Sequence, residues 1–144
     1  MQHKFTIRRL DMAEQATILV VDDDRDFVNI TRMILESQQY RVVTAANGEQ
    51  GLTVMRMEKP DLVILDIMMS YIVEGLDVRR KMAEDKALQH IPVIMVTSLT
   101  SARAQGEMPS HDYIPDSTWL NKPIDPDLLL ERVRELLGSS SATT

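Results

Sequence analysis

Acidic side chains stand where two apolar runs of the sequence stop. Asp22 and Asp23 follow the run Thr17 to Val21, and Asp66 lies near the end of the run Asp61 to Ile67. Carboxylates held close together repel one another, so such a group needs a positive partner. Mg²⁺ prefers oxygen ligands, and two carboxylates with a backbone carbonyl would suffice to hold it. The three acids predict a magnesium site, provided that the fold brings them together.

Two further polar positions follow apolar runs. Thr97 and Ser98 come after 91–96, and Lys122 comes after 117–120. A lysine, a hydroxyl and Mg²⁺ suit a phosphoryl group, because its transfer depends on positioning and charge neutralisation. Asp66 is the best-placed nucleophile, since a carboxylate can accept phosphate as an acyl phosphate. The chain has neither common Gly-rich nucleotide loop, so we expect the phosphoryl group to come from a separate donor.

These residues meet only if the apolar runs are strands of one parallel sheet. We expect strands at 17–21, 40–45, 61–67, 91–96 and 117–120, alternating with helices at about 24–37, 48–59, 75–85, 101–107 and 126–137. Gly138 is expected to end the last helix. This alternation indicates an α/β fold, a doubly wound five-stranded parallel sheet with helices on both faces. Ligands of such sheets bind at the carboxyl ends of the strands.

Length and composition narrow the class of protein. The chain has 144 residues, of which 44% are hydrophobic and 26% charged, as expected for one globular domain. The net charge of −6 argues against direct binding of nucleic acid. No cysteine, signal peptide or membrane-length apolar run is present, so we expect a cytoplasmic protein with no membrane contact. We expect the domain over 17–138, a flexible extension at 1–16 and a disordered tail at 139–144.

Four motifs, in order, resemble the receiver domain of bacterial two-component response regulators. They are ILVVDDD at Ile18 to Asp24, DLVILDIMM at Asp61 to Met69, IPVIMVTS at Ile91 to Ser98 and NKPI at Asn121 to Ile124. The similarity covers about residues 17 to 137. It implies a flavodoxin-like sheet with the strand order 2-1-3-4-5.

The resemblance implies a role for each polar residue at the predicted edge. Asp66 would be the phosphoacceptor, and Asp23 would bind Mg²⁺ directly. Asp22 would act on the metal through water, and the backbone carbonyl of Met68 would complete the protein ligands. Thr97 and Lys122 would bind phosphoryl oxygens, and the peptide bond between Lys122 and Pro123 would be cis.

The resemblance also implies a switch and a lifetime. Thr97 and Trp119 would couple phosphorylation to the surface formed by the fourth helix, the fifth strand and the fifth helix. Met68 and Leu99 stand at the positions that orient or exclude the hydrolysing water. Both are apolar and cannot hold a water by hydrogen bonds, so we expect slow loss of the phosphoryl group.

Three features depart from the family pattern. Ser70 replaces the usual proline four residues after the phosphoacceptor, and Glu74-Gly75 comes one residue later than the usual Asp-Gly. The segment from Thr97 to Lys122 is about three residues longer than usual, and the switch aromatic, commonly Tyr or Phe, is Trp119. We expect a reshaped loop after Asp66.

The implied partners are a sensor histidine kinase or a histidine phosphotransfer protein, and an output protein that the sequence does not identify. Only six residues follow Gly138, so we expect a stand-alone receiver that acts by binding another protein. We expect a switch rather than an enzyme. Two alternatives remain at this point: a Mg²⁺-dependent phosphatase, although Met68 stands where its second acid belongs, and a receiver-like module that works without phosphorylation.

Overall fold

The computed structural model describes residues 15–67, 74–98 and 119–142. Five strands form one parallel sheet, and its order is β2-β1-β3-β4-β5. The strands are β1 (Thr17–Val21), β2 (Arg41–Ala45), β3 (Leu62–Asp66), β4 (Val93–Thr97) and β5 (Trp119–Asn121). This confirms the predicted doubly wound, flavodoxin-like fold, so the carboxyl ends of all five strands lie at the same edge.

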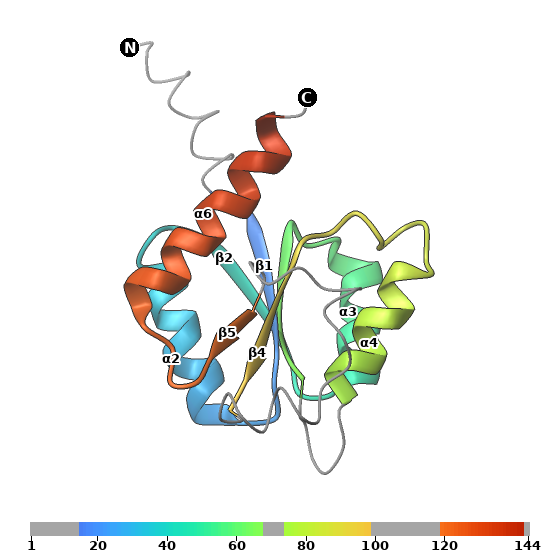
Figure 1. Cartoon of the computed structure of the whole chain (residues 1–144), viewed down its shortest axis with the longest axis horizontal. Helices are drawn as coiled ribbons and strands as arrows, with labels where there is room; N and C mark the ends of the chain where they lie inside the picture. Colours follow the sequence, from blue (N-terminus) through green and yellow to red (C-terminus); the bar gives the residue numbers. More distant parts are fainter. Residues whose placement is uncertain (1–14, 68–73, 99–118, 143–144) are drawn as a thin grey trace.

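Four described helices cover the two faces of the sheet. They are α2 (Arg25–Glu36), α3 (Gly48–Glu58), α4 (Glu74–Ala83) and α6 (Pro126–Ala142). Figure 1 shows α2 and α6 against one face and α3 and α4 against the other. None of the helices in the described part of the chain is long and apolar enough to cross a membrane.

Two separate hydrophobic clusters form the core because the sheet is buried on both faces. Alternate residues of a strand point to opposite faces, so on β1 Leu19 and Val21 join one cluster while Ile18 and Val20 join the other. Helices α3 and α4 close the first cluster, and α2 and α6 close the second. This burial explains why β1, β3 and β4 read as continuous apolar runs in the sequence.

Two helices, α2 and α3, begin close to the strand ends, and a side chain caps the N-terminus of each. The side chain of Asp24 accepts hydrogen bonds from the backbone of Asp26 and Phe27, so Asp24, rather than Asp26, caps α2. Asn47 caps α3 in the same way. Helix α3 ends at Lys59, which adopts a left-handed conformation (φ 49°) just before Pro60. The helices therefore begin at the edge where the strands end.

One predicted boundary is wrong. Helix α6 continues through Gly138 to Ala142, so the predicted end at Gly138 fails and residues 139–142 are helical rather than a disordered tail. A glycine ends a helix when it takes the left-handed conformation, and Gly138 keeps helical geometry instead. The predicted helix at 101–107 and most of the predicted extension at 1–16 lie outside the described residues.

Candidate functional site

Three carboxylates meet at the carboxyl edge of the sheet. Asp22 and Asp23 follow β1, and Asp66 is the last residue of the neighbouring β3. One carboxylate oxygen from each of the three lies within 4.8 Å of the other two. Asp22 and Asp66 are buried, with 2% and 4% of their surface exposed, whereas Asp23 is exposed. The structure therefore brings together the three acids that the sequence singled out.

Asp22 is fixed by its surroundings. Its Oδ1 accepts a hydrogen bond from the backbone N–H of Asp24 at 2.9 Å. Its own backbone N–H donates to the carbonyl of Ala45 at the end of β2, at 3.1 Å. These two bonds leave Oδ2 directed toward the rest of the cluster, where it meets Lys122.

Lys122 supplies the positive charge beside the acids. Its Nζ lies 2.9 Å from Oδ2 of Asp22 and 3.7 Å from Oδ2 of Asp66, and its side chain is 17% exposed. Its backbone N–H donates to the carbonyl of Thr97 at 2.8 Å, which fixes its position just after β5. The peptide bond from Lys122 to Pro123 is cis, as predicted.

The surroundings of Lys122 favour its charged form. Burial is the largest influence on its pKa and favours the neutral amine. The hydrogen bond with Asp22 and the charges of Asp66, Asp22 and Asp24 act in the opposite direction and together outweigh burial. The pKa of Lys122 is therefore raised above the usual value for lysine, and the side chain is an ammonium at neutral pH.

The single ammonium does not balance three carboxylates, so the cluster retains surplus negative charge. An all-oxygen donor set with surplus negative charge is what a hard divalent cation requires. A hollow of about 450 Å³ opens beside Asp22 and Asp23, between α2 and the ends of β2 and α3. The donor atoms present thus fit a divalent cation, and Asp23 exposes one side of the cluster to solvent.

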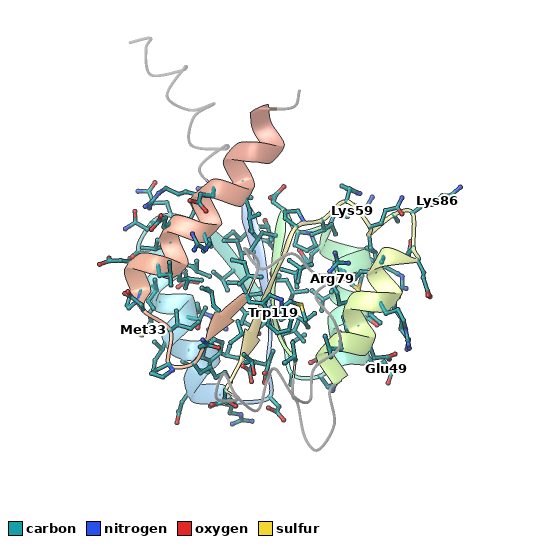
Figure 2. The ribbon with its side chains drawn as sticks, in the orientation of Figure 1. Met33, Glu49, Lys59, Arg79, Lys86 and Trp119 are labelled. Atoms are coloured by element: carbon teal, nitrogen blue, oxygen red, sulfur yellow. The ribbon has the colours of Figure 1, made fainter. Side chains whose placement is uncertain are left out.

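Thr97 and Trp119 occupy neighbouring strands. Thr97 is the last residue of β4, is 3% exposed and lies opposite Asn121 of β5. Trp119 begins β5 opposite Met95, and its partly buried side chain packs against the cluster that α3 and α4 close. Figure 2 shows Trp119 near the middle of the molecule.

Gly75 marks a close approach beside Asp66. A Cβ at Gly75 would overlap the carbonyl oxygen of Asp66 and would lie 2.5 Å from Cα of Ile67. The backbone N–H of Gly75 donates to the carbonyl of Ile67 at 3.1 Å. Because these neighbours are backbone atoms, α4 can begin here only without a side chain.

The structure adds two residues to those predicted for the site. The face of the Phe27 ring lies against Lys122, with Nζ 4.4 Å from the ring centroid. Asp24, which caps α2, also contributes to the charge that favours the lysine ammonium. Phe27 lies in the first turn of α2, just after the acid loop, but its residue type gave no sign of a contact with Lys122. Of the other predicted residues, Met68, Ser70 and Leu99 lie outside the described part of the chain.

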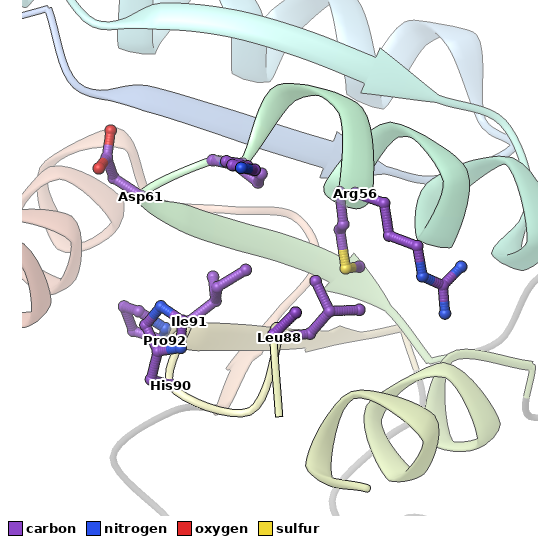
Figure 3. Close-up of a pocket in the computed structure, with 10 residues that line it drawn as sticks. Arg56, Asp61, Leu88, His90, Ile91 and Pro92 are labelled. Carbon is purple, nitrogen blue, oxygen red and sulfur yellow. The ribbon is translucent and has the colours of Figure 1, made fainter. Parts of the chain in front are cut away.

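A second hollow, also of about 450 Å³, lies at the opposite edge, where β3 and β4 begin. Figure 3 shows Arg56 and His90 toward opposite ends of this hollow, with Leu88 and Ile91 between them. Two acids at this edge have structural partners, and of these two only Asp61 lines the hollow. Asp61 accepts the backbone N–H of Thr17 at 2.8 Å, and Asp85 forms an ion pair with Arg56 at 3.3 Å. The hollow therefore gathers no surplus charge of the kind found at the carboxyl edge.

Known proteins are similar to this chain in sequence and in fold. Response regulator PleD of Caulobacter vibrioides is 38% identical over 124 residues, which are 84% of this chain and 26% of PleD. Transcriptional regulatory protein ResD of Bacillus subtilis is 34% identical over 138 residues, which are 94% of this chain and 53% of ResD. The chain thus spans between about a quarter and about half of these curated relatives.

Two solved structures resemble the fold. A CheY-like response regulator receiver domain protein from Methanospirillum hungatei has a TM-score of 0.76 and 29% identity, and the match covers 90% of this chain and 98% of that one. The chemotaxis response regulator CheY4 of Vibrio cholerae has a TM-score of 0.72 and 25% identity, with 85% and 98% covered. Residues 18–134 match the response regulator receiver domain family. The chain therefore belongs to the response regulator receiver domains of two-component signalling.

Proposed function

We propose that the chain is a signalling switch that accepts a phosphoryl group on Asp66. The observation that carries this proposal is the juxtaposition of Asp66 with Lys122 and two further acids at the carboxyl edge of the sheet. Asp66 is 4% exposed, it is the last residue of β3, and its Oδ2 lies 3.7 Å from Nζ of Lys122. A positioned carboxylate beside a fixed ammonium suits the transfer of a phosphoryl group.

The reaction exchanges one bond to phosphorus for another. A carboxylate oxygen of Asp66 forms a bond to phosphorus while the bond from phosphorus to a histidine nitrogen of the donor breaks. The electron pair of the broken bond stays on the histidine nitrogen, and Asp66 becomes an acyl phosphate. Lys122 and the hydroxyl of Thr97 bind the phosphoryl oxygens, which carry the negative charge during the transfer.

The metal that fits the cluster is Mg²⁺. Asp23 and Asp66 would hold it directly together with the backbone carbonyl of Met68, and Asp22 would act through a bound water. When bound, Mg²⁺ screens the repulsion between the Asp66 carboxylate and the anionic phosphoryl group. The surplus negative charge of the acid cluster supports this assignment.

The donor would be a sensor histidine kinase or a histidine phosphotransfer protein, and the output would be the binding of another protein. Thr97 and Trp119 would carry the change from the site to the surface, because the Thr97 hydroxyl moves toward a phosphoryl oxygen and vacates space that an aromatic side chain can fill. The apolar residues Met68 and Leu99 would slow hydrolysis, so the signal would outlast a response on the scale of seconds.

Intact-mass measurement tests the phosphoacceptor. After incubation with acetyl phosphate and Mg²⁺, the chain should gain one phosphoryl group, and Asp66→Ala should gain none. Asp61→Ala is the matched control, because Asp61 precedes the same strand at its other end. Persistent labelling of Asp66→Ala, or full labelling in EDTA, would contradict the proposal.

Fluorescence tests the switch, because Trp119 is the only tryptophan. Binding of beryllofluoride, which mimics a phosphoryl group, should change the emission of Trp119, and Thr97→Ala should reduce that change. Unchanged emission with the mimic bound, or an undiminished change in Thr97→Ala, would count against the coupling.

A further inference from the structure

The ammonium of Lys122 is enclosed by two carboxylates and one aromatic ring. Asp22 lies at 2.9 Å and Asp66 at 3.7 Å, and the centroid of the Phe27 ring lies at 4.4 Å. The carboxylates belong to the acid cluster, whereas Phe27 belongs to α2. Each of the three contacts therefore comes from a different element: the loop after β1, the end of β3 and the first turn of α2.

The position of Phe27 depends on the same loop that presents the acids. Its backbone N–H donates to Oδ1 of Asp24 at 3.2 Å, as part of the cap that begins α2. Its partly buried side chain packs against the cluster that α2 and α6 close. The ring is thus held through its backbone and through the packing of its side chain, and it offers a surface to the Lys122 ammonium.

The attraction of an aromatic ring differs from that of a carboxylate. The face of the ring carries negative electrostatic potential and attracts a cation within about 6 Å of its centroid. It offers no directed acceptor atom, so the ammonium can shift across it without losing the attraction. The ring also covers one side of the ammonium, and only 17% of the lysine side chain is exposed.

We propose that Phe27 is a positioning residue for Lys122. It holds the ammonium within reach of Asp66 when Asp22 is engaged by another ligand and attracts Lys122 less. A divalent cation competes with Lys122 for the carboxylate oxygens, whereas it does not bind the aromatic ring, which has no oxygen donor. The contact stands on the geometry alone, and its consequence for phosphoryl acceptance rests on the proposed function.

Two substitutions of Phe27 separate the effect of the aromatic face from the effect of side-chain packing. Phe27→Leu keeps an apolar side chain and removes the aromatic face, while Phe27→Tyr keeps the face. Ile34→Val is the matched control for packing, because Ile34 is also partly buried on α2 and packs against the same cluster.

Nuclear magnetic resonance of the chain without donor gives the first readout. Protons on Cε of Lys122 should be shifted upfield by the ring current of Phe27. The shift should disappear in Phe27→Leu and persist in Phe27→Tyr and Ile34→Val. An unchanged Lys122 resonance in Phe27→Leu would overturn the contact itself.

The rate of labelling by acetyl phosphate with Mg²⁺ gives the second readout. Phe27→Leu should be slower by roughly 2- to 30-fold, the range expected for loss of one cation–π interaction. Phe27→Tyr should restore the rate, and Ile34→Val should leave it unchanged. A lost ring-current shift with an unchanged rate would overturn the positioning role. Failure of the proposed function shows differently, as an unsubstituted chain that takes no label while its Lys122 resonance still depends on Phe27.

Discussion

The two edges of the sheet use the same residue types in different ways. At the carboxyl edge, three aspartates lie together, and the two buried ones, Asp22 and Asp66, share one lysine. At the amino edge, charges have separate partners: Asp61 holds the backbone of Thr17, and Asp85 holds Arg56. The carboxyl edge therefore keeps surplus charge in a confined space, while the charges of the amino edge are matched locally.

This difference shows what distinguishes a functional cluster from a structural one. A carboxylate that caps a backbone N–H or pairs with one arginine has its requirement met within the fold. A cluster whose charges do not balance stores repulsion that a ligand can relieve. Substitutions that compare the two edges test this distinction directly.

The largest effect on the free energy of unfolding is expected at Gly75, where the carboxyl edge is most crowded. Gly75→Ala places a methyl group against the backbone of Asp66 and should lower the free energy of unfolding by about 3 kcal/mol or more. Gly138→Ala is the control, because nothing lies within 4 Å of its Cβ position in α6. That substitution should stabilise the chain by about 1 kcal/mol. Urea unfolding of both variants measures the contrast, and equal effects would contradict it.

Magnesium should stabilise the chain through one edge only. At a concentration 100 times its dissociation constant, a ligand that binds only the folded state adds about 2.7 kcal/mol. Asp23→Asn should raise the melting temperature without Mg²⁺, because it removes a repelling charge, and should abolish the increase that Mg²⁺ causes.

Asp61→Asn is the control at the amino edge. It weakens the hydrogen bond to Thr17 and should lower the free energy of unfolding by about 1 kcal/mol with or without Mg²⁺. Melting curves of both variants at several Mg²⁺ concentrations provide the measurement. A full Mg²⁺ response in Asp23→Asn would place the cation elsewhere.

The raised pKa of Lys122 predicts a dependence of stability on alkaline pH. The folded state holds this proton more tightly than the unfolded chain, so the stabilisation is fully present below the usual lysine pKa of about 10.4. It is lost as pH rises through the higher pKa of the folded state. The difference in unfolding free energy between the native chain and Lys122→Met should be constant from about pH 7 to 9 and shrink above about 10.5. A difference that grows with alkaline pH would contradict this.

The smallest effect on the free energy of unfolding is expected for the ion pair of Arg56 at the amino edge. Arg56 and Asp85 form an ion pair whose side chains are 55% and 29% exposed, so water and salt weaken it. Arg56→Ala should change the free energy of unfolding by no more than about 0.5 kcal/mol. It should leave phosphate incorporation unchanged. A large loss of labelling would show that the two edges are coupled.

The sequence predicted the carboxyl edge well because each strand there ends in an abrupt change from apolar to polar residues. That change located Asp22, Asp23 and Thr97, and the acid loop also marked the start of α2. The role of Phe27 was not predicted, because an apolar residue in a helix carries no sign of a lysine that lies far along the chain.

Other features depended on information that local patterns do not hold. Gly138 reads as a helix end, but whether a glycine takes the left-handed conformation depends on the residues that follow it. Asp61 reads as the start of a strand, and its bond to Thr17 follows from the register between β1 and β3. The crowding at Gly75 likewise arises from the path of the backbone beside Asp66.

The sheet separates the two hydrophobic clusters, so the packing of one cluster depends little on the packing of the other. Ile64 belongs to the cluster beside α2 and α6, while its neighbour Leu65 belongs to the one beside α3 and α4. Substitutions on opposite faces share few contacts, so their effects on stability should add, whereas substitutions within one face should depend on each other. Packing changes in the helical layer on one face should therefore have little effect on the packing of the opposite layer.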